Sequence, residues 1–282
     1  MNIPLTIIRD LEQQQIVIVR AERVSGGDIN EAAKLYTKSG QTLFLKYNLE
    51  QGAQAILKSE LLGLQVLKEK GLPVPQLYTH SIDVHYPYLL MEWVEPDKAQ
   101  PEQLATALAQ LHRNTQFTYG FSYDNHIGSL DQSNKPHENF ADFYINCRIE
   151  PQLALAKRTR SIVFPYSLKH FHRIVENTIP QEAPALIHGD LWSGNLIHSE
   201  SGPVFIDPSV SYGHREMDLA MMRMFGGFEE AVFVSYEEQC KLEKGWRERA
   251  DIFQLYYWLV HVNLFGGQYR HSAEKVFRKY LM

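Results

Sequence analysis

The sequence predicts an α+β fold in two lobes, a small lobe rich in strands and a larger lobe that is mostly helical. β-branched and aromatic residues dominate the first third of the chain, and a helical apolar periodicity dominates from Glu102 onward. The stretch EPDKAQPEQ between these regions is rich in proline and charge, which is typical of a linker. We therefore expect an N-terminal lobe over residues 1–95 and a C-terminal lobe over residues 96–282.

The first lobe is expected to hold an antiparallel sheet. Strand-like segments cover residues 16–24, 32–40 and 42–48, with the turn residues SGGD and KSGQ between them. A helical pattern then follows Asn48 and stops at KGLP near Gly71, where glycine and proline end helices. A further apolar strand covers residues 86–94 and leads into the linker.

The second lobe is expected to consist of helices interrupted by two short β-rich segments, residues 185–191 and 202–208. The helical patterns cover residues 104–114, 138–158, 215–225 and 252–265. The last of these is strongly apolar but shorter than a membrane span, so we interpret it as a buried helix.

Composition excludes several classes of protein. The chain has 282 residues, of which 44% are hydrophobic and 22% charged, as in ordinary globular proteins. A net charge of −5 with a pI near 6.2 gives no basic stripe, so no nucleic acid partner is expected. Without a long apolar run or a signal-peptide pattern, no membrane association is expected and a cytoplasmic location is predicted. Cys147 and Cys240 are far apart and are expected to be free thiols.

The most informative segment is LIHGDLWSGNL at residues 186–196, followed by VFIDP at residues 204–208. Asn195 follows Asp190 by five positions, the same offset as between the aspartate and the asparagine of the protein-kinase catalytic loop. Asp207 follows an apolar strand, as the metal-binding aspartate of protein kinases does. Taken alone, HGD could be a turn with a buried histidine, and FIDP could be a simple strand end. The shared spacing and the two flanking strands favour the kinase-like interpretation.

Phosphoryl transfer explains why these residue types are needed. A carboxylate must orient the attacking hydroxyl and accept its proton, which is the role expected for Asp190. Mg²⁺ prefers oxygen ligands, and Asp207 with Asn195 would supply one charged and one neutral oxygen. His188 is expected to brace the loop and not to bind metal. The sequence thus predicts ATP and Mg²⁺ as cofactors.

These motifs also carry a resemblance. HGDLWSGN together with FIDPSVSYGHREMDLAMMRMFGGF resembles the fructosamine/ketosamine kinase family, whose relatives are the aminoglycoside and choline kinases. GGDINEA, FLKYN, SELLGLQVL, DNHIGSLDQSN and RIEPQLALA extend the resemblance over nearly the whole chain. It implies a protein-kinase-like fold and ATP-dependent phosphorylation of the 3-hydroxyl of a ketosamine, either a ribulosamine or a fructosamine. The phosphorylated product would leave the amine, which amounts to deglycation.

The resemblance assigns the nucleotide-binding residues of the first lobe. It implies that Lys46, in a predicted strand, contacts the α- and β-phosphates of ATP and that Glu60, in the following helix, holds this lysine in place. An ion pair between strand and helix is compatible with the local patterns. Taken alone, Lys46 could be a solubilising edge-strand residue and Glu60 a solvated helix position.

Two backbone segments are further candidates for ATP binding. Gly26 and Gly27 lie between two predicted strands, where glycine would let backbone amides approach the phosphates, although they could equally form a plain hairpin turn. Met91, Glu92, Trp93 and Val94 end the strand before the linker, where adenine would meet the interlobe backbone. Otherwise this segment is an ordinary strand end.

Candidates for substrate contact lie close to Asp190 in sequence. A sugar pocket needs an aromatic face and polar groups, and Trp192 and His214, with Tyr212 and Glu216 as weaker candidates, could supply them. The alternative is scaffold: Trp192 as a packed anchor, and His214 and Glu216 as caps. Asp218 is placed by the resemblance beneath the HGD loop, where it would accept hydrogen bonds from backbone amides.

Several functions remain open from the sequence. The substrate could be a small glycated amine, a glycated protein, or the alcohol acted on by a sister kinase of the aminoglycoside, choline or homoserine type. The chain could also be a catalytically silent nucleotide-binding protein, although the complete set of site residues argues against decay. A protein kinase proper is disfavoured because PSVSYGHRE, and no segment ending in A-P-E, follows Asp207.

Overall fold

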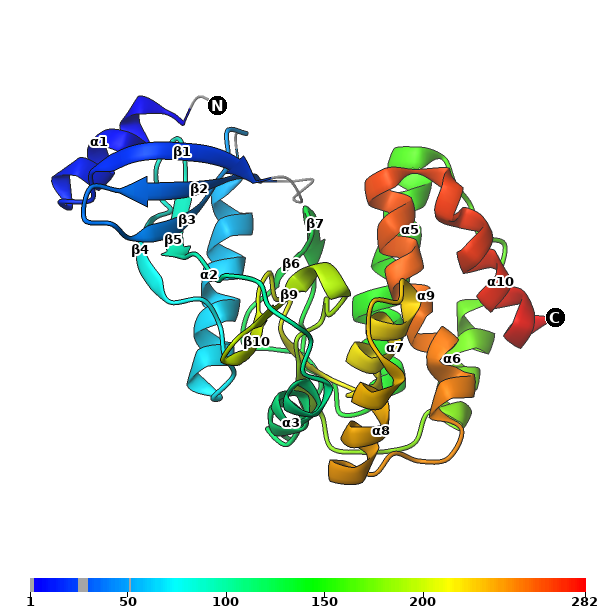
Figure 1. Ribbon diagram of the computed structural model, residues 1–282. Coiled ribbons are helices and arrows are strands. Elements are labelled where there is room, and N and C mark those ends of the chain that lie inside the picture. The colour runs from blue at the N-terminus through cyan, green and yellow to red at the C-terminus, as the bar shows by residue number, and fades with distance from the viewer. Residues whose placement is uncertain (1–2, 25–29, 51) are drawn as a thin grey trace.

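The computed structural model describes residues 3–24, 30–50 and 52–282, and the predicted phosphate-loop glycines Gly26 and Gly27 lie outside these ranges. Figure 1 shows the sheet and helix α1 at one end of the molecule, helices α5, α6, α9 and α10 at the other, and β6, β9, β10 and α3 between them. This arrangement confirms the predicted α+β fold of a small strand-rich lobe followed by a larger helical one.

The small lobe is built on a five-stranded antiparallel sheet with the strand order β1-β2-β3-β5-β4. Its strands are β1 (Ile18–Val24), β2 (Glu31–Thr37), β3 (Thr42–Tyr47), β4 (Leu77–Ser81) and β5 (Tyr88–Glu92). Helix α1 (Leu5–Gln13) packs on one face, and helix α2 (Gln54–Glu69) packs on the other. The antiparallel sheet and the helix ending before Gly71 agree with the sequence analysis, whereas α1 and β4 were not predicted.

Side-chain alternation along β3 decides which residues face α2. Leu43, Leu45 and Tyr47 pack with α1, so Phe44 and Lys46 point to the opposite face. β3 is a central strand, flanked by β2 and β5, and the side chain of Lys46 is buried against α2. Lys46 is therefore not a solubilising edge-strand lysine.

The connection between the lobes is shorter than predicted. Helix α3 (Pro101–His112) begins inside the expected linker, because proline is well suited to the first position of a helix. The preceding segment is tied to the second lobe, since the Asp97 amide donates to the His198 oxygen at 2.7 Å. A small hairpin follows α3 and consists of β6 (Asn125–Ile127) and β7 (Leu130–Gln132).

The helical lobe is organised around the long helix α9 (Trp246–Phe265), which is buried over most of its length. Its other helices are α4 (Phe140–Tyr144), a π-helical turn (Ile145–Ile149), α5 (Glu150–Arg160), α6 (Leu168–Thr178), α7 (Glu216–Met224), α8 (Glu230–Gln239), a 3₁₀ turn (Gly267–Tyr269) and α10 (Arg270–Leu281). The helix predicted over 138–158 is present but contains the π turn. Among the described residues, no helix is both long enough and apolar enough to span a bilayer.

Four short strands place the functional loops side by side. They are β8 (Ala185–Ile187), β9 (Leu196–Ser199), β10 (Gly202–Phe205) and β11 (Ser211–Gly213). β8 pairs with β11 and β9 pairs with β10, in both cases antiparallel. The loop after β8 and the loop between β10 and β11 therefore emerge together, which brings segments 188–195 and 206–210 into contact.

Candidate active site

The two loops are joined by hydrogen bonds on both sides of His188. The Ser209 amide donates to the His188 oxygen at 2.9 Å, and Nε2 of His188 lies 3.0 Å from the Ile206 oxygen. Burial lowers the pKa of His188, so the ring is neutral, donates from Nε2 and accepts the Asp190 amide at Nδ1, 3.3 Å away. His188 braces the loop, as predicted. Gly189 has φ +83°, and a Cβ there would lie 2.1 Å from the Ser209 oxygen, so glycine is required.

Asp190 is held by Asn195. The amide nitrogen of Asn195 donates to the main-chain oxygen of Asp190 at 2.8 Å and to its carboxylate at 3.1 Å. Burial and the nearby charge of Asp207 raise the pKa of Asp190 to about 7, although the hydrogen bond from Asn195 works in the opposite direction. A carboxylate with a pKa near neutrality is well suited to accept a proton from a hydroxyl group.

Lys46 joins the two lobes at this point. Its ammonium nitrogen lies 2.7 Å from a carboxylate oxygen of Glu60 and also contacts the carboxylate of Asp207. Burial disfavours the charged ammonium, but the carboxylates of Asp207 and Glu60 outweigh it and raise the pKa of Lys46. The predicted pairing of Lys46 with Glu60 is therefore present, and Lys46 is a cation buried between two acids.

The oxygens of Asn195 and Asp207 fit a Mg²⁺ ion. Because the amide nitrogen of Asn195 is directed to Asp190, the amide oxygen is the atom left for a metal. Asp207 adopts the left-handed conformation with φ +53°, which is uncommon for aspartate, and 40% of its side chain is exposed. Oxygen donors of this kind are those that Mg²⁺ prefers.

Asp218, at the start of α7, supports the catalytic loop from below. Its two carboxylate oxygens accept the amides of His188 at 2.7 Å and Gly189 at 2.9 Å, and the residue is fully buried. This is the support that the resemblance implied. His112 of α3 adds a contact of 3.3 Å from Nε2 to Asp218 and is itself hydrogen-bonded to the Tyr236 hydroxyl at 2.7 Å.

The predicted hinge segment lies where β5 ends. Met91 is buried beneath α2, whereas Glu92, Trp93 and Val94 are half-buried and lead toward α3. The amides of Glu92 and Trp93 donate within the sheet, to Gln76 and Thr42 respectively. Any contribution of these two residues' backbone to a bound base would therefore come from their carbonyl oxygens.

Trp192 is the exposed aromatic residue of the catalytic loop. Its side chain is 38% exposed, and its ring covers the backbone of Gly194, where a Cβ would lie 2.1 Å from the ring. Tyr212 is half-buried and stacks on Phe121 with 5.9 Å between ring centroids. Part of the Trp192 ring is therefore exposed beside the catalytic loop, and its contact with a sugar stays a prediction.

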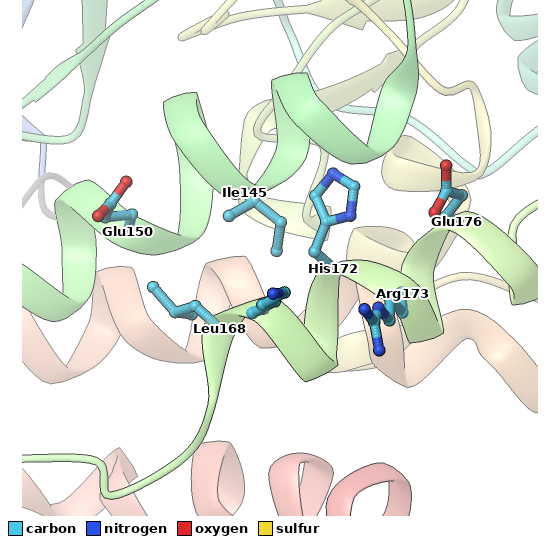
Figure 2. Close-up of a pocket in the computed structure, with 7 residues that line it drawn as sticks. Ile145, Glu150, Leu168, His172, Arg173 and Glu176 are labelled. Carbon is cyan, nitrogen blue, oxygen red and sulfur yellow. The ribbon is translucent and has the colours of Figure 1, made fainter.

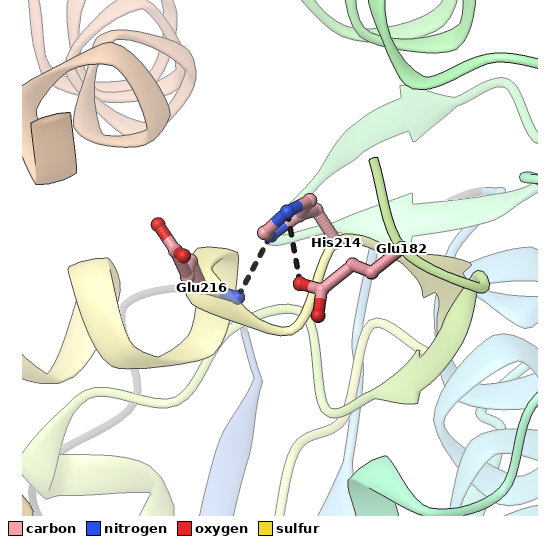
Figure 3. A group of neighbouring side chains, drawn as sticks. All are labelled: Glu182, His214 and Glu216. Atoms are coloured by element: carbon pink, nitrogen blue, oxygen red, sulfur yellow. Dashed lines mark hydrogen bonds and ion pairs between the residues drawn. The ribbon is translucent and has the colours of Figure 1, made fainter. Parts of the chain in front are cut away.

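The prediction that His214 contacts the substrate is wrong. Its side chain is fully buried between Phe140 and Phe253, and its Nε2 lies 2.8 Å from a carboxylate oxygen of Glu182 (Figure 3). The other ring nitrogen accepts the amide of Glu216 at 3.3 Å, at the beginning of α7. His214 is part of the core and accepts the first amide of α7, which is close to the scaffold role that the sequence left open.

Glu216 is likewise buried and structural. Its two carboxylate oxygens accept hydrogen bonds from Arg249 at 2.8 and 2.5 Å. Glu182 pairs with Arg215 at 2.7 Å as well as with His214, and these partners lower the pKa of Glu182 although burial opposes them. Glu182, His214 and Glu216 come close enough together to suggest a metal site, but each acid already has a cationic partner. This group is a charge-balanced network within the protein.

The comparison with known sequences decides the family. The sequence profile of the fructosamine kinases matches residues 2–282 of the chain. The chain belongs to the fructosamine kinase family. It is therefore an ATP-dependent phosphotransferase that acts on a hydroxyl group.

Relatives resemble the chain over nearly its full length. It is 38% identical to a probable ketoamine kinase of Enterococcus faecium, with 98% of this chain and 99% of that one aligned. It is 33% identical to the chloroplastic protein-ribulosamine 3-kinase of Arabidopsis thaliana, with coverage of 94% and 83%. A crystal structure of a Haemophilus somnus protein named for fructosamine-3-kinase superposes with a TM-score of 0.85 at 26% identity and coverage of 98% and 97%.

The fold extends beyond the fructosamine kinases. The choline kinase LicA of Streptococcus pneumoniae superposes with a TM-score of 0.62 at 18% identity, over 97% of both chains. At this identity the likeness concerns the fold alone. It agrees with the kinase-like two-lobed architecture predicted from the sequence.

Sequence analysis missed several residues that position this fructosamine kinase site. His112 beneath Asp218 could have been noticed as a polar residue four positions after Leu108 on the apolar face of its helix. Gly63 could have been noticed as a glycine within a helical pattern: a Cβ there would lie 2.9 Å from Pro208, so α2 approaches the Asp207 loop closely.

The β6–β7 hairpin also ties α2 to that loop. Nδ1 of His126 lies 2.7 Å from the Ser59 hydroxyl of α2, and the Ser209 hydroxyl donates to the His126 oxygen. Nothing in the local sequence indicates these contacts, since they join three distant segments.

A pocket of about 440 Å³ opens elsewhere on the helical lobe, between the π turn, α5 and α6 (Figure 2). Its lining residues are Ile145, Glu150, Leu168, Lys169, His172, Arg173 and Glu176. None of Lys46, Asp190, Asn195 and Asp207 lines it, so this pocket is separate from the candidate active site.

Proposed function

We propose that this chain phosphorylates the 3-hydroxyl of ketosamines, either fructosamines or ribulosamines, with ATP and Mg²⁺, and so promotes deglycation. One observation carries the proposal. The Asp190 carboxylate accepts a hydrogen bond from Asn195, and the negative charge of Asp207 acts on this carboxylate. Asp207 in turn forms an ion pair with the buried Lys46. A base, two metal ligands and a phosphate-binding cation are the parts that phosphoryl transfer requires.

Asp190 acts as the base. Its carboxylate orients the 3-hydroxyl and accepts its proton while the hydroxyl oxygen forms a bond to the γ-phosphorus of ATP and the bond from that phosphorus to the β-phosphate oxygen breaks. A pKa of about 7 means that Asp190 is largely ionised just above neutrality and still basic enough to take the proton.

Lys46 and Glu60 act on the nucleotide. Lys46 contacts the α- and β-phosphates, and Glu60 keeps the ammonium group in position through their 2.7 Å ion pair. Asn195 and Asp207 would hold Mg²⁺, which when bound supplies positive charge to the phosphates. The backbone of residues 91–94 contacts the adenine.

Trp192 binds the sugar. Its exposed ring, two residues from the base, offers an apolar face to the carbon skeleton.

Glycated lysine side chains of proteins carry the same ketosamine group as free glycated amines, so both are proposed substrates. The lobes divide near residue 95, and the protein works in the cytoplasm.

The test is a panel of alcohols with Mg-ATP. The purified protein is incubated with a synthetic fructosamine, a ribulosamine, choline, homoserine and an aminoglycoside, and the position of the new phosphate is read by NMR. We expect phosphate on the 3-hydroxyl of a ketosamine, with activity lost in Asp190→Ala and retained in Phe117→Leu, a change at a fully exposed side chain. If another alcohol of the panel is phosphorylated and the ketosamines are not, the chain is a sister kinase of the choline, homoserine or aminoglycoside type.

The metal dependence of ATP binding, measured beside phosphate transfer, distinguishes an active kinase from a catalytically silent nucleotide-binding protein. ATP binding is measured by calorimetry with and without Mg²⁺, and we expect tighter binding with the metal and a loss of that difference in Asp207→Ala. Metal-dependent binding without transfer to any alcohol of the panel would contradict the proposed kinase activity.

A further inference from the structure

A cluster of aromatic side chains surrounds His261 on the face of α9 near its C-terminal end. The ring of His261 lies 5.0 Å from Phe225, 5.1 Å from Tyr269, 5.4 Å from Phe265 and 6.4 Å from Trp258, between centroids. The outer rings also contact one another: Phe225 is 5.6 Å from Trp258, and Trp258 stacks on Tyr269 at 6.2 Å. We call these five residues the aromatic cluster.

The aromatic cluster adjoins the catalytic loop at one end. Phe225 follows α7 and precedes Gly227, whose backbone lies so close to Ser193 that a Cβ there would be 2.6 Å from the serine side chain. Ser193 immediately follows Trp192, the residue that we propose as the sugar contact. The chain therefore connects the cluster to the acceptor side of the site within a few residues.

Helix α9 carries three members of the cluster. Tyr257 of α9 is fully buried, and burial together with the negative charges of Asp218 and Asp190 raises the pKa of its hydroxyl. His261 follows Tyr257 by about one helical turn, a rise of about 6 Å. Its Nδ1 lies 2.8 Å from the main-chain oxygen of Tyr257. Helix α9 thus places the ring of His261 one turn beyond a residue of the buried core.

The cluster is partly open to solvent. Phe225 is 44% exposed and Phe265 is 43% exposed, whereas Trp258, His261 and Tyr269 are half-buried. Rings that serve only to join helices would be expected to bury their apolar faces more fully. Here the two phenylalanines at the edges leave aromatic surface available to a ligand.

The chemistry of the cluster suits a cation that can donate a hydrogen bond. Aromatic faces attract positive charge, and several rings together can surround an alkylated ammonium group. Burial lowers the pKa of His261, so the ring is neutral; Nδ1 donates to Tyr257, which leaves Nε2 as an acceptor. A protonated secondary amine satisfies both features, because it is cationic, bears carbon substituents and donates hydrogen bonds.

We propose that the aromatic cluster binds the protonated amine of the substrate and the substituent attached to it, while the sugar hydroxyl lies at Asp190. The inference rests on the proposed function and extends it, because it names the residues that distinguish a glycated amine from a plain sugar. In a ketosamine the amine is on the first carbon and the accepting hydroxyl on the third. The contact of Gly227, two residues after Phe225, with Ser193 places the cluster next to the catalytic loop, so a ligand that extends from Asp190 along this loop would meet it.

The test compares two substrates that differ in one atom. An N-alkyl ketosamine is compared with the matching 1-O-alkyl ketose, in which an uncharged ether oxygen replaces the amine. The variants Phe225→Leu and Phe265→Leu remove a ring and keep an apolar side chain at an exposed position, and Phe117→Leu serves as the control outside the cluster.

Each cluster variant is expected to raise KM for the ketosamine by about fivefold to thirtyfold, the range that one cation–π contact supports. The values of kcat and of KM for ATP should stay within about twofold. KM for the ether, or Ki where the ether is not turned over, should be unchanged, as should all values in the Phe117→Leu control. Equal effects on amine and ether, or no effect on either, would overturn the proposal.

Failure of the proposed function is distinguished by a binding measurement. If the wild-type chain phosphorylates no ketosamine, the proposed function fails, and the cluster is then tested with piperidinium and its uncharged analogue tetrahydropyran by ligand-observed NMR. Preferential binding of piperidinium that Phe225→Leu and Phe265→Leu weaken would support a cation site independent of that reaction. Equal binding of both probes, or binding of neither, would overturn the inference.

Discussion

The side-chain amide of Asn195 holds Asp190 by two hydrogen bonds, one to the main-chain oxygen at 2.8 Å and one to the carboxylate at 3.1 Å. The 3₁₀ turn of residues 193–195 folds the chain back so that positions five apart can meet. As a result, the proposed base and a proposed metal ligand form one rigid unit. The offset of five between the two residues has its physical reason in this turn.

Asn195→Ala is expected to lower kcat by about 100-fold or more, because it removes a metal ligand and the group that orients the base. It should also move the acidic limb of the kcat–pH profile to higher pH, since the lost hydrogen bond favours the ionised form of Asp190. The profile is measured by steady-state kinetics at saturating Mg-ATP. An unshifted limb would show that the hydrogen bond does not control the base.

The wild-type kcat is expected to fall as pH decreases through about 7, because Asp190 then becomes protonated. The same shift has a consequence for stability. Between the ordinary carboxyl pKa and about 7 the folded protein binds a proton that the unfolded chain has lost, so this group makes the protein less stable as pH rises through that window.

Asp190→Asn should therefore be inactive yet more stable than the wild type at pH 8, by about 1–3 kcal/mol of unfolding free energy. The gain should shrink toward pH 4, where wild-type Asp190 is protonated in the folded state. Urea unfolding at both pH values measures it. A variant that is less stable at pH 8 would contradict the unfavourable ionisation of this half-buried carboxylate.

Asp218→Ala is expected to destabilise the protein by about 3–5 kcal/mol, because it leaves the buried amides of His188 and Gly189 without an acceptor. Asp218→Asn keeps one acceptor and should cost less while still lowering kcat. Asp83→Ala, a change at an exposed aspartate, is the control. Chemical denaturation gives the energies, and equal effects for Asp218→Ala and Asp83→Ala would refute the supporting role of Asp218.

Gly63→Ala is expected to reduce kcat/KM for Mg-ATP by about tenfold or more, because the added methyl group meets Pro208 and displaces α2, and with it Glu60, from the Asp207 loop. Alanine is otherwise the better helix residue by about 0.5–1 kcal/mol, so a large loss of stability is not expected. Gln65→Ala, at an exposed position of the same helix, provides the comparison. Unchanged kinetics in Gly63→Ala would mean that α2 tolerates the shift.

The core of the site could be read from the sequence because its signals are local. Asp190, Asn195 and Asp207 are fixed by short spacings around strands, and the structure brings them together as predicted. Lys46 and Glu60 lie on different elements, but each was indicated by its own strand or helix and by the resemblance, and they meet at 2.7 Å. Asp218 was likewise indicated by the resemblance, and it accepts the amides of His188 and Gly189.

His214 shows where local reasoning stops. Its closeness to Asp190 in sequence suggested a substrate contact, but β11 and the start of α7 turn its ring into the core between Phe140 and Phe253. Whether a polar residue after a strand faces a ligand or the interior depends on what packs over it. That covering comes from segments far away in the chain.

The sequence by itself therefore determined the two-lobed α+β architecture, the family and the spacing of the residues at the centre of the site, because strand alternation, helix periodicity and turn geometry act over a few residues. Only the tertiary structure decided that His214 is buried, that His112 and the β6–β7 hairpin support the catalytic loops, and that Phe225 and Phe265 meet around His261. These contacts join segments whose separation along the chain carries no periodic signal, and they exist only once the helices have packed.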